Sequence, residues 1–462
     1  MCVRHIAVID IGKTNAKVGV VDAIHGAEID IATQPNTVLA EPPYPHYDLQ
    51  GLWSFIVDAL ARHNGNYGID AISIATHGAS IVLLDRDGNL AVPMLDYEFA
   101  GPDDLSAGYD AIRPDFQETG SPRLPLGLNV GAQIYWQLDR DADLLDRIAS
   151  VVTYPQYWSY KLTGAKNTEM TSLGAHTDLW NPQDRRFSSL VRRLGLADKM
   201  APAQIAARCT HLLRPDIAAL TGLRAGIPVA SGIHDSNASL YPYLLALKGA
   251  FSVVSTGTWV ISFAVGGRGK DLSPERDTLL NVNAFGDPVP SARFMGGREF
   301  DLVMKEGARH ASEEDVSRVL AHPIQLYPAV DPLSGPFQGA RAGWSVDESA
   351  LTDGERYAAA SFYLALVTSR CLELIGAEGP TIVEGPFARN DLFMKMLEAA
   401  TARIAAGSDV STTGTGLGAA LLVSDTLKNP VEPVDRTGVV TADPAYTAYA
   451  RSWFHKVGTS RA

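Results

Sequence analysis

The sequence predicts an α/β protein with two domains of related architecture. The chain has 462 residues, which is long for a single hydrophobic core, so two domains are the expectation. Residues 6–22 and residues 253–263 share one pattern, an apolar strand, a polar loop with glycine, and a second apolar strand. Because these segments lie about half a chain apart, we predict a duplicated architecture in which each half offers a polar loop to one cleft.

Composition and charge argue against several functional classes. The net charge is −13 and no strongly basic tract is present, which argues against a nucleic-acid partner. No apolar run approaches the ~18 residues that a membrane span needs, and the N-terminus has no signal pattern. Three cysteines, Cys2, Cys209 and Cys371, are far apart and odd in number. They form no metal spacing or disulfide framework, so we expect a reducing compartment and therefore a cytoplasmic protein.

The first hairpin carries the strongest polar loop. An apolar run from Ile6 to Ile9 ends in Asp10, and a second run covers Val18 to Val21. Backbone N–H groups and lysines of such a loop can meet phosphate oxygens, while the carboxylate meets a metal ion through water. An ordinary surface turn explains the same residues equally well. The loop between the runs contains Gly12, Lys13, Thr14, Asn15 and Lys17.

A second candidate site follows the predicted helix over residues 52–64. A short apolar strand, residues 71–75, ends in Thr76, His77 and Gly78. Polar groups at the end of a buried strand are placed to meet a ligand in an open α/β sheet. His77 could therefore hydrogen-bond a hydroxylated substrate. The alternative is a histidine that is satisfied within a strand-end turn.

The middle of the chain is predicted to be helical and irregular. Short helices are expected over residues 132–138, 144–152 and 156–162, and the Leu162-Thr163-Gly164 sequence has glycine at the position of a helix C-terminal cap. We predict that this region forms the lid of the first domain.

The second half begins with a strand over residues 228–230 that leads into His234 and Asp235. A carboxylate at this strand end can act as general base toward a substrate hydroxyl. It can equally be the N-cap of a helix that is expected to begin near Asn237. A further hairpin, with strands at 250–254 and 260–265, presents Gly257 and Thr258 in its loop.

The last third contains a long amphipathic helix, predicted over residues 353–375. A strand at residues 380–383 leads into the segment Glu384-Gly385-Pro386-Phe387-Ala388-Arg389-Asn390, and a helix follows at 392–400. The glycine-rich run 413–418 is predicted to enter a helix over 419–427. Its glycines could let the backbone approach a nucleotide, or permit close helix packing.

Taken together, these motifs resemble the FGGY family of carbohydrate kinases, and they occur in the family's order over nearly the whole chain. The resemblance implies two actin-like (ribonuclease H-like) ATPase domains with a ligand cleft between them, with residues 1–225 as the sugar-binding domain and 226–462 as the nucleotide-binding domain. The His234-Asp235 pair, the Ser255-Thr256-Gly257-Thr258-Trp259 run and the Gly296-Gly297-Arg298-Glu299 run are most similar to the rhamnulose and fuculose kinase branch.

The resemblance implies an ATP-dependent kinase that uses Mg²⁺ and phosphorylates the primary hydroxyl of a small ketose. Asp235 is the expected catalytic base, and Asp10 is expected to hold the metal through water. The expected substrate-binding residues are Thr76, His77, Gly78, His234 and Asp235. The expected nucleotide-binding residues are Gly12, Lys13, Thr14, Asn15, Lys17, Gly257, Thr258, Gly385, Pro386, Ala388 and Asn390.

Two alternatives remain open from the residues. One is a kinase for another ketose or polyol, such as xylulose, ribulose or glycerol. The other is a non-catalytic sugar or nucleotide sensor on the same fold, because fold alone does not fix function. The expected partners are a small-molecule sugar and ATP, and a homodimer is the oligomeric state considered.

Overall fold

The computed structural model describes residues 3–408, 414–424, 427, 429, 431 and 442–459. Cys2 and Thr413 therefore lie outside the described residues. The chain divides into two compact units, each described by itself below. Unit 1 contains Met1–Ala246, Leu280–Pro288 and Thr412–Glu432, and unit 2 contains Leu247–Leu279, Val289–Ser411 and Pro433–Ala462. Both units draw on separate stretches of chain, a division that differs from the single boundary predicted at 225/226.

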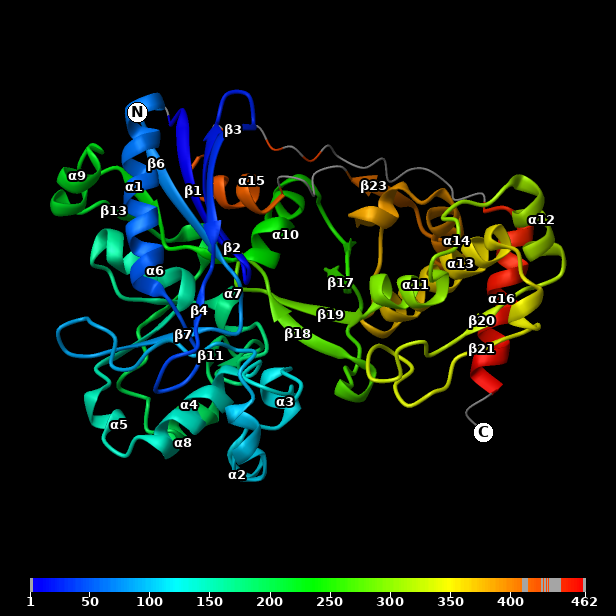
Figure 1. Ribbon diagram of the computed structural model, residues 1–462, viewed down its shortest axis with the longest axis horizontal. Helices are drawn as coiled ribbons and strands as arrows, with labels where there is room; N and C mark the ends of the chain where they lie inside the picture. Colours follow the sequence, from blue (N-terminus) through cyan, green and yellow to red (C-terminus); the bar gives the residue numbers. More distant parts are fainter. Residues whose placement is uncertain are drawn as a thin grey trace. The chain divides into compact units, whose positions relative to one another are not determined.

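Unit 1 is built on a seven-stranded sheet in the order β13-β14-β6-β1-β2-β3, with β15 also paired to β6 (Figure 1). Strand β2 pairs antiparallel with both β1 and β3, whereas β6 is parallel to β1, β14 and β15. The strands of unit 1 are β1 (His5–Ile11), β2 (Asn15–Asp22), β3 (Ala27–Pro35), β4 (Val38–Leu39), β5 (His46–Tyr47), β6 (Ala71–Thr76), β7 (Ile81–Leu84), β8 (Ser150–Thr153), β9 (Thr168–Glu169), β10 (Trp180–Asn181), β11 (Arg186–Phe187), β12 (Ala203–Gln204), β13 (Thr210–Leu212), β14 (Pro228–Ala230) and β15 (Ile233–His234).

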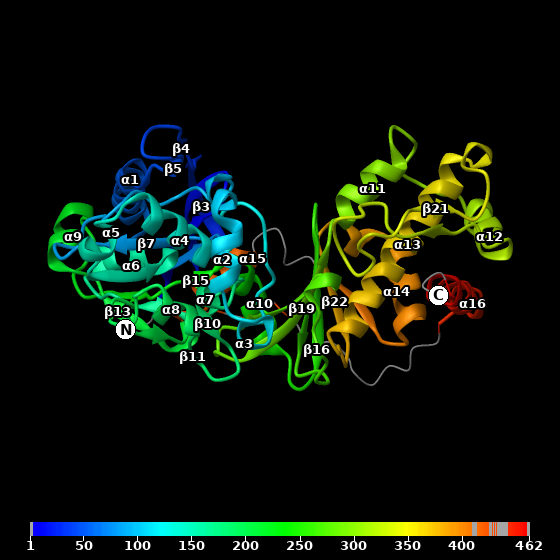
Figure 2. The ribbon, with the colours of Figure 1, turned by 90° about the horizontal axis from the view of Figure 1, so that it is seen from below.

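Helices cover both faces of this sheet. Odd-numbered β1 residues such as Ile9 pack with α1, α6 and α9, whereas even-numbered ones such as Val8 pack with α10 and α15. The last two helices lie side by side in Figures 1 and 2. The helices of unit 1 are α1 (Leu49–Tyr67), α2 (Ser106–Ile112), α3 (Phe116–Thr119), α4 (Val130–Arg140), α5 (Leu144–Arg147), α6 (Tyr154–Thr163), α7 (Met170–Leu173), α8 (Ser189–Arg193), α9 (Pro215–Thr221), α10 (Asp235–Ala246), α15 (Gly414–Ala420) and the 3₁₀ helices η1 (Gly101–Leu105) and η2 (Ala206–Arg208).

Unit 2 repeats the strand pattern of unit 1. Its six-stranded sheet has the order β18-β19-β17-β16-β22-β23, in which β16 and β17 form an antiparallel hairpin and β22 is parallel to β16. The β16–β17 hairpin with parallel β22 corresponds to the β1–β2 hairpin with parallel β6 in unit 1. This correspondence is what the predicted duplication requires. The strands are β16 (Phe251–Thr256), β17 (Val260–Val265), β18 (Thr278–Val282), β19 (Pro288–Phe294), β20 (Leu326–Tyr327), β21 (Gly343–Trp344), β22 (Thr381–Glu384) and β23 (Ala405–Ser408). The last three residues of β18 and the first residue of β19 fall in the stretch Leu280–Pro288, which is counted with unit 1.

One large hydrophobic core joins the unit 2 sheet to its helices. Val254 and Phe294 of the sheet pack in one cluster with Phe362, Phe393 and Trp453 from three helices. The described helices of unit 2 are α11 (Gly296–Met304), α12 (Glu313–Ala321), α13 (Asp353–Leu374), α14 (Asp391–Thr401), α16 (Pro444–Thr459) and the 3₁₀ helices η3 (Pro274–Arg276), η4 (Glu348–Ala350) and η5 (Pro386–Arg389). The long helix predicted over 353–375 is confirmed as α13.

Two predicted helices differ from the structure. The helix expected over 144–152 ends at Arg147, because the β-branched Val151 and Val152 pair with β7 as part of strand β8. The helix expected over 419–427 is α15, which ends at Ala420. The glycines lie within this helix rather than before it, and a Cβ on Gly418 would stand 1.8 Å from the carbonyl oxygen of Ala238. Close packing against α10 is therefore one use of this glycine.

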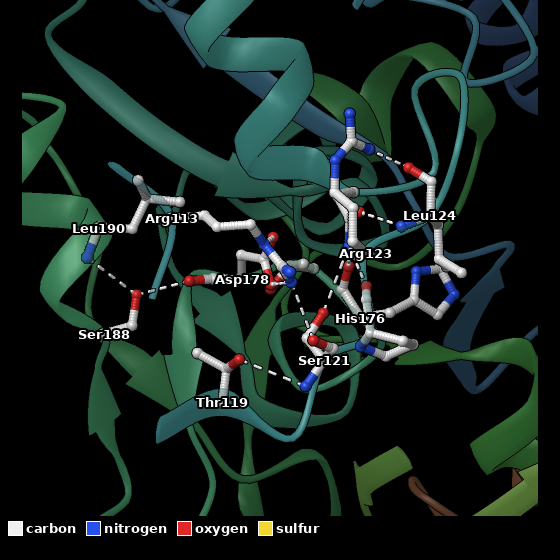
Figure 3. Close-up of polar contacts among 12 residues, drawn as sticks. Arg113, Thr119, Ser121, Arg123, Leu124, His176, Asp178, Ser188 and Leu190 are labelled. Atoms are coloured by element: carbon white, nitrogen blue, oxygen red, sulfur yellow. Dashed lines mark hydrogen bonds and ion pairs between the residues drawn. The ribbon is translucent and has the colours of Figure 1, made fainter. Parts of the chain in front are cut away.

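A buried ion pair fixes the irregular chain between α2 and α8 (Figure 3). The Arg113 guanidinium donates to both carboxylate oxygens of Asp178, at 3.2 and 2.9 Å, and to the carbonyl of Ser121 at 2.9 Å. The Ser188 hydroxyl donates to the backbone carbonyl of Asp178 at 2.6 Å. Asp178 has no exposed side-chain area, so losing the arginine would leave a buried charge unpaired. This cluster is structural support for unit 1.

No helix within the described part of the chain is long and apolar enough to cross a membrane.

Candidate functional site

Three parallel strands of unit 1 bring the predicted sugar-site residues to one sheet edge. Thr76, the last residue of β6, lies opposite Ile11 of β1 on one side and His234 of β15 on the other. Because parallel strands end at the same edge, Asp10, His77 and Asp235 follow each other across it. The sequence motifs were recognised separately, and the register of the sheet brings these three together.

His77 is buried in a cage of tyrosine rings. Its ring centroid lies 5.2, 5.4 and 5.0 Å from those of Tyr47, Tyr97 and Tyr154. Nδ1 lies 2.9 Å from the carbonyl oxygen of Gly78, whereas Nε2 is buried with no hydrogen-bond partner among the described residues. Burial lowers the pKa of His77 to about 4. A neutral ring that donates from Nδ1 has an acceptor lone pair on Nε2, which can receive a hydroxyl proton.

Gly78 is required by the close approach of His234. A Cβ at residue 78 would stand 2.6 Å from His234 Nε2. This nitrogen also lies 3.3 Å from the Oδ1 atom of Asp235. The predicted residues Gly78, His234 and Asp235 therefore form one contact set. Thr76 is fully buried, and its hydroxyl donates to the carbonyl of His77 at 3.1 Å. This hydrogen bond stabilises the backbone at the end of β6.

Asp235 begins helix α10, so the predicted helix start near Asn237 is wrong by two residues. Its Oδ1 atom accepts hydrogen bonds from the backbone N–H and the hydroxyl of Ser236, at 2.5 and 3.2 Å. An N-cap oxygen accepts from an N–H two or three residues further on. The described bonds of Asp235 go to the adjacent residue instead. Its side chain is 32% exposed, so the carboxylate remains accessible to a substrate.

Asp10 lies at the end of β1 within electrostatic range of Asp235. Burial, and then the charge of Asp235, raise the pKa of Asp10 to about 6. Lys17, opposite Asp10 in the β1–β2 register, counteracts this rise. The charge of Asp235 disfavours ionisation of Asp10, and a cation bound beside Asp10 would offset that repulsion. Among the described residues, no group of three or more His, Cys, Asp or Glu could hold a metal ion, so the fit is to a metal held mainly by water and phosphate.

The predicted first phosphate loop is a tight turn in the structure. The backbone N–H of Gly12 donates to the carbonyl of Asn15 at 2.9 Å, and Asn36 braces the turn through bonds to Gly12 and Thr14. Thr14 and Asn15 are exposed. The turn thus presents its polar groups outward from a fixed backbone.

Lys13 has contacts that the sequence did not suggest. Its ammonium forms an ion pair with Asp96, and lies 3.2 Å from Glu98 Oε2 and 3.2 Å from the hydroxyl of Tyr47. It also lies over the rings of Tyr47 and Tyr97, 5.0 and 4.8 Å from their centroids. These contacts point to a role other than the predicted one at a phosphate.

Sequence reasoning missed the tyrosines and acidic residues around His77. Tyr47 lies in strand β5, within a Pro- and Tyr-rich stretch that reads as a loop, and Asp96 and Tyr97 follow it by about fifty residues in a segment without helix or strand periodicity. The available signal was the Pro- and Tyr-rich composition of residues 41–50. Contacts between such distant irregular segments depend on the tertiary fold.

A buried carboxylate supports the strand that ends in His234. Glu169 accepts hydrogen bonds from the backbone N–H and the hydroxyl of Thr171, at 2.7 and 2.6 Å. The same hydroxyl accepts from the backbone N–H of His234 at 3.1 Å. Burial raises the pKa of Glu169 to about 7. Glu169 thereby fixes the direction of the Thr171 hydroxyl, which in turn holds the backbone next to Asp235.

Unit 2 contains a cavity of about 400 Å³ beside its hairpin loop. This volume is in the range of small-molecule sites. Four of the predicted nucleotide-binding residues line it, together with aromatic and basic residues that the sequence did not indicate. The predicted four are Gly257, Thr258, Pro386 and Asn390, and the others include Phe300, Arg309, Tyr357, Phe387 and Arg389.

Gly385 and Ala388, which were also predicted to bind nucleotide, are not among the described residues that line this cavity. Gly385 has φ +83°, and a Cβ there would stand 2.0 Å from the carbonyl oxygen of Thr256. The carbonyl of Ala388 instead faces Gly407. The side chain of Asn390 caps α14, accepting from the N–H groups of Leu392 and Phe393. The segment after β22 is therefore shaped by its fit to β16 and α14.

Family models match both halves of the chain. One described as the FGGY family of carbohydrate kinases, N-terminal domain, matches residues 5–241, and one described as carbohydrate kinase FGGY, C-terminal domain, matches residues 248–431. Among curated relatives, L-fuculokinase from Escherichia coli (strain K12) is 25% identical over 271 residues, 55% of each chain. A rhamnulokinase from Pectobacterium carotovorum subsp. carotovorum (strain PC1) is 26% identical over 280 residues, 56% of this chain and 52% of the relative. The chain spans about half the length of these relatives.

Solved structures extend the likeness over the whole chain. A carbohydrate kinase from Novosphingobium aromaticivorans is 34% identical, with a TM-score of 0.90 and 100% coverage of both chains. The xylulose kinase from Rhodospirillum rubrum, at 19% identity and a TM-score of 0.78 over 99% of this chain and 98% of its own, shows the fold alone. With both domain models matched in order and the two ribonuclease H-like sheets in place, this chain belongs to the FGGY family of carbohydrate kinases.

Proposed function

We propose that this protein transfers the γ-phosphate of ATP to the primary hydroxyl of a small, uncharged ketose. The observation that carries the proposal is the juxtaposition of Asp235, an accessible carboxylate, with the buried, unpartnered Nε2 atom of His77. Asp235 influences the pKa of His77, so the two groups lie within electrostatic range. One can accept a hydrogen bond from a substrate hydroxyl while the other removes a proton from the attacking hydroxyl.

In this proposal the substrate lies at the sheet edge of unit 1. His77 accepts a hydrogen bond from one sugar hydroxyl, and His234 offers a further polar contact. Tyr97, which is partly exposed, can stack on the apolar C–H face of the sugar, as aromatic rings with a polar end commonly do. Asp235 accepts the proton of the primary hydroxyl, a role typically worth ~10²–10⁴-fold in rate.

The charge around this site favours a neutral sugar over a sugar acid. Burial, and then Glu98, Asp235 and Asp96, raise the pKa of the Tyr97 phenol, so all three carboxylates act on the same place. The ammonium of Lys13 already pairs with two of them. A carboxylate on the substrate would therefore be repelled by Glu98, Asp235 and Asp96, two of which already hold the Lys13 ammonium.

ATP is proposed to bind in the cavity of unit 2. The cavity offers aromatic side chains at Phe300 and Tyr357, suited to an adenine ring, and Arg389 nearby suits negative charge. Arg309 also lines the cavity, where it is paired with Asp301 at 2.8 Å. Thr14, Asn15 and Lys17 are the proposed phosphate contacts of unit 1, and Gly257 and Thr258 those of unit 2. Asp10 would hold Mg²⁺ through water, which when bound neutralises charge on the phosphates.

L-rhamnulose and L-fuculose are the first substrates to test, because two relatives carry the names rhamnulokinase and L-fuculokinase. The experiment measures sugar-dependent ADP release with Mg·ATP across a panel of 6-deoxy-ketohexoses, xylulose, ribulose, glycerol and the acid gluconate. Turnover that is highest with a neutral ketose supports the proposal. Turnover highest with gluconate would overturn the neutral-substrate argument. No turnover with any compound, together with sugar binding, would favour the sensor.

A further inference from the structure

The ammonium of Lys13 is held by three acceptors that all belong to unit 1. These are the carboxylates of Asp96 and Glu98 and the hydroxyl of Tyr47. An ammonium has three N–H donors, so these partners match its full donor capacity. The Lys13 side chain is 21% exposed and that of Asp96 is 11% exposed. The pair is therefore shielded from water more than an ordinary surface ion pair.

Lys13 and His77 contact the same two tyrosine rings. The Lys13 ammonium lies 5.0 Å from the ring centroid of Tyr47 and 4.8 Å from that of Tyr97. The His77 ring lies 5.2 and 5.4 Å from the same two centroids. Asp96 also accepts from the Tyr47 hydroxyl at 3.1 Å. One carboxylate and one ammonium thus fix both rings beside the unpartnered Nε2 of His77.

We propose that Lys13 is a positioning residue of the sugar subsite, which acts by holding Tyr47, Asp96 and Tyr97 around His77 rather than by binding phosphate. This inference rests on the proposed function, since it assigns the ring cage to the sugar. It replaces the nucleotide contact that the loop sequence alone suggested for Lys13.

Electrostatics oppose a dual role for this lysine. If the ammonium left its site to meet a phosphate, Asp96 would keep a largely shielded charge without its cation. Removing one partner of a shielded ion pair is costly, because the other charge remains desolvated. Lys17 faces Asp10 across the hairpin and is exposed, so it offers a free ammonium at lower cost. Lys13 and Lys17 of the same hairpin therefore have different proposed roles, one at the sugar subsite and one at the phosphates.

The test compares Lys13→Met with Lys17→Met in the full-length protein. The probe is L-rhamnulose, or whichever panel ketose gives the highest kcat/KM. We expect Lys13→Met to raise the KM for sugar about tenfold or more, the size expected for a lost charge-assisted contact, and to leave the KM for ATP within about twofold. Lys17→Met is expected to show the opposite pattern. Lys161→Met is the matched control, because Lys161 also lies over an aromatic ring, that of Trp53 at 4.9 Å, away from the site.

Sugar binding without nucleotide gives a second readout. Calorimetry with the same ketose and no ATP should show weaker binding to Lys13→Met and unchanged binding to Lys17→Met and Lys161→Met. A raised KM for ATP with unchanged sugar binding in Lys13→Met would overturn the inference. If the wild-type protein turns over no sugar, the proposed function fails first, and sugar binding by the variants still decides the role of Lys13.

A double-mutant cycle separates positioning from general loss of stability. Asp96→Asn removes the partner charge, and the double variant Lys13→Met/Asp96→Asn leaves no unpaired carboxylate at that position. We expect the two effects on sugar affinity to be strongly non-additive, with the double variant no worse than Lys13→Met alone. Additive losses would contradict the proposed coupling. Melting temperatures of the three variants show whether a variant that binds poorly is folded.

Discussion

The hydroxyl of Thr171 accepts a hydrogen bond from the backbone N–H of His234 at 3.1 Å while it donates to the buried carboxylate of Glu169 at 2.6 Å. This link joins α7 to the strand that carries Asp235 at its end. Because the donor direction of the hydroxyl is taken by Glu169, its lone pair is left to receive the N–H. The arrangement fixes the backbone from which the proposed base projects.

Thr171→Val should therefore impair catalysis through position. Valine keeps the shape of threonine but removes the acceptor, leaving the His234 N–H without its partner. We expect kcat to fall about tenfold with little change in either KM, because small displacements of a catalytic group lower the rate of the chemical step. Steady-state kinetics measure this split. Thr171→Ser keeps the hydroxyl and should restore most of kcat, whereas equal losses in both variants would point to packing alone.

Asp235→Asn tests the proposed base. The amide keeps the size and the oxygen that accepts from Ser236, but it cannot take a proton. We expect a folded protein that binds sugar and ATP with near-normal affinity and turns over at least ~10²-fold more slowly. Calorimetry and single-turnover assays provide the two measurements. A variant that keeps most of its kcat would remove Asp235 from the mechanism and return it to a structural role at the start of α10.

The sequence predicted well what local patterns determine. The hairpins at β1–β2 and β16–β17, the buried strand β6 and the capped helix α13 follow from β-branched runs, glycine loops and helical periodicity. Helix boundaries were less accurate where tertiary pairing decided the outcome, as at Val151 and Val152 in β8. The secondary-structure propensity of one segment does not show whether a strand about seventy residues away will pair with it.

The candidate site likewise contains residues that local sequence patterns indicated and residues that only the tertiary fold brings together. Asp10, His77 and Asp235 each end a recognisable strand, so their residue types and places in the chain were accessible from sequence. The surroundings of Lys13 were not, since Asp96 and Tyr47 come from irregular segments that the fold brings to the loop. The residue's charge suggested a phosphate contact, and only its neighbours show that the charge is already paired.

Gly385→Ala should destabilise the loop beside the unit 2 cavity. Gly385 has φ +83°, and an added Cβ would stand 2.0 Å from the backbone oxygen of Thr256, which cannot move aside as a flexible side chain would. We expect a lower melting temperature, with a cost of at least ~1–3 kcal/mol, and a raised KM for ATP. Gly339→Ala is the matched control, because Gly339 also has positive φ, +77°, but a Cβ there meets nothing within 4 Å. Equal losses in the two variants would show that backbone strain alone, and not contact with β16, explains the effect.

The final prediction concerns the protonation of His77. Burial lowers the pKa of this histidine to about 4, compared with an ordinary value near 6.5. Between these two values the unfolded chain binds a proton that the folded protein does not. The contribution of the neutral ring to stability is therefore present above pH ~6.5 and is lost as the pH falls toward 4. His77→Gln removes this titration, so its melting temperature should fall less steeply than that of the wild type from pH 6.5 to 4. In NMR spectra of histidine-labelled protein, the His77 ring signal is identified as the one that is absent from His77→Gln. In the wild-type protein we expect this signal not to shift between pH 5.5 and 8. A midpoint near 6.5 for that signal would mean that the ring is charged at lower pH, and the proposed acceptor role of Nε2 would then fail in that range.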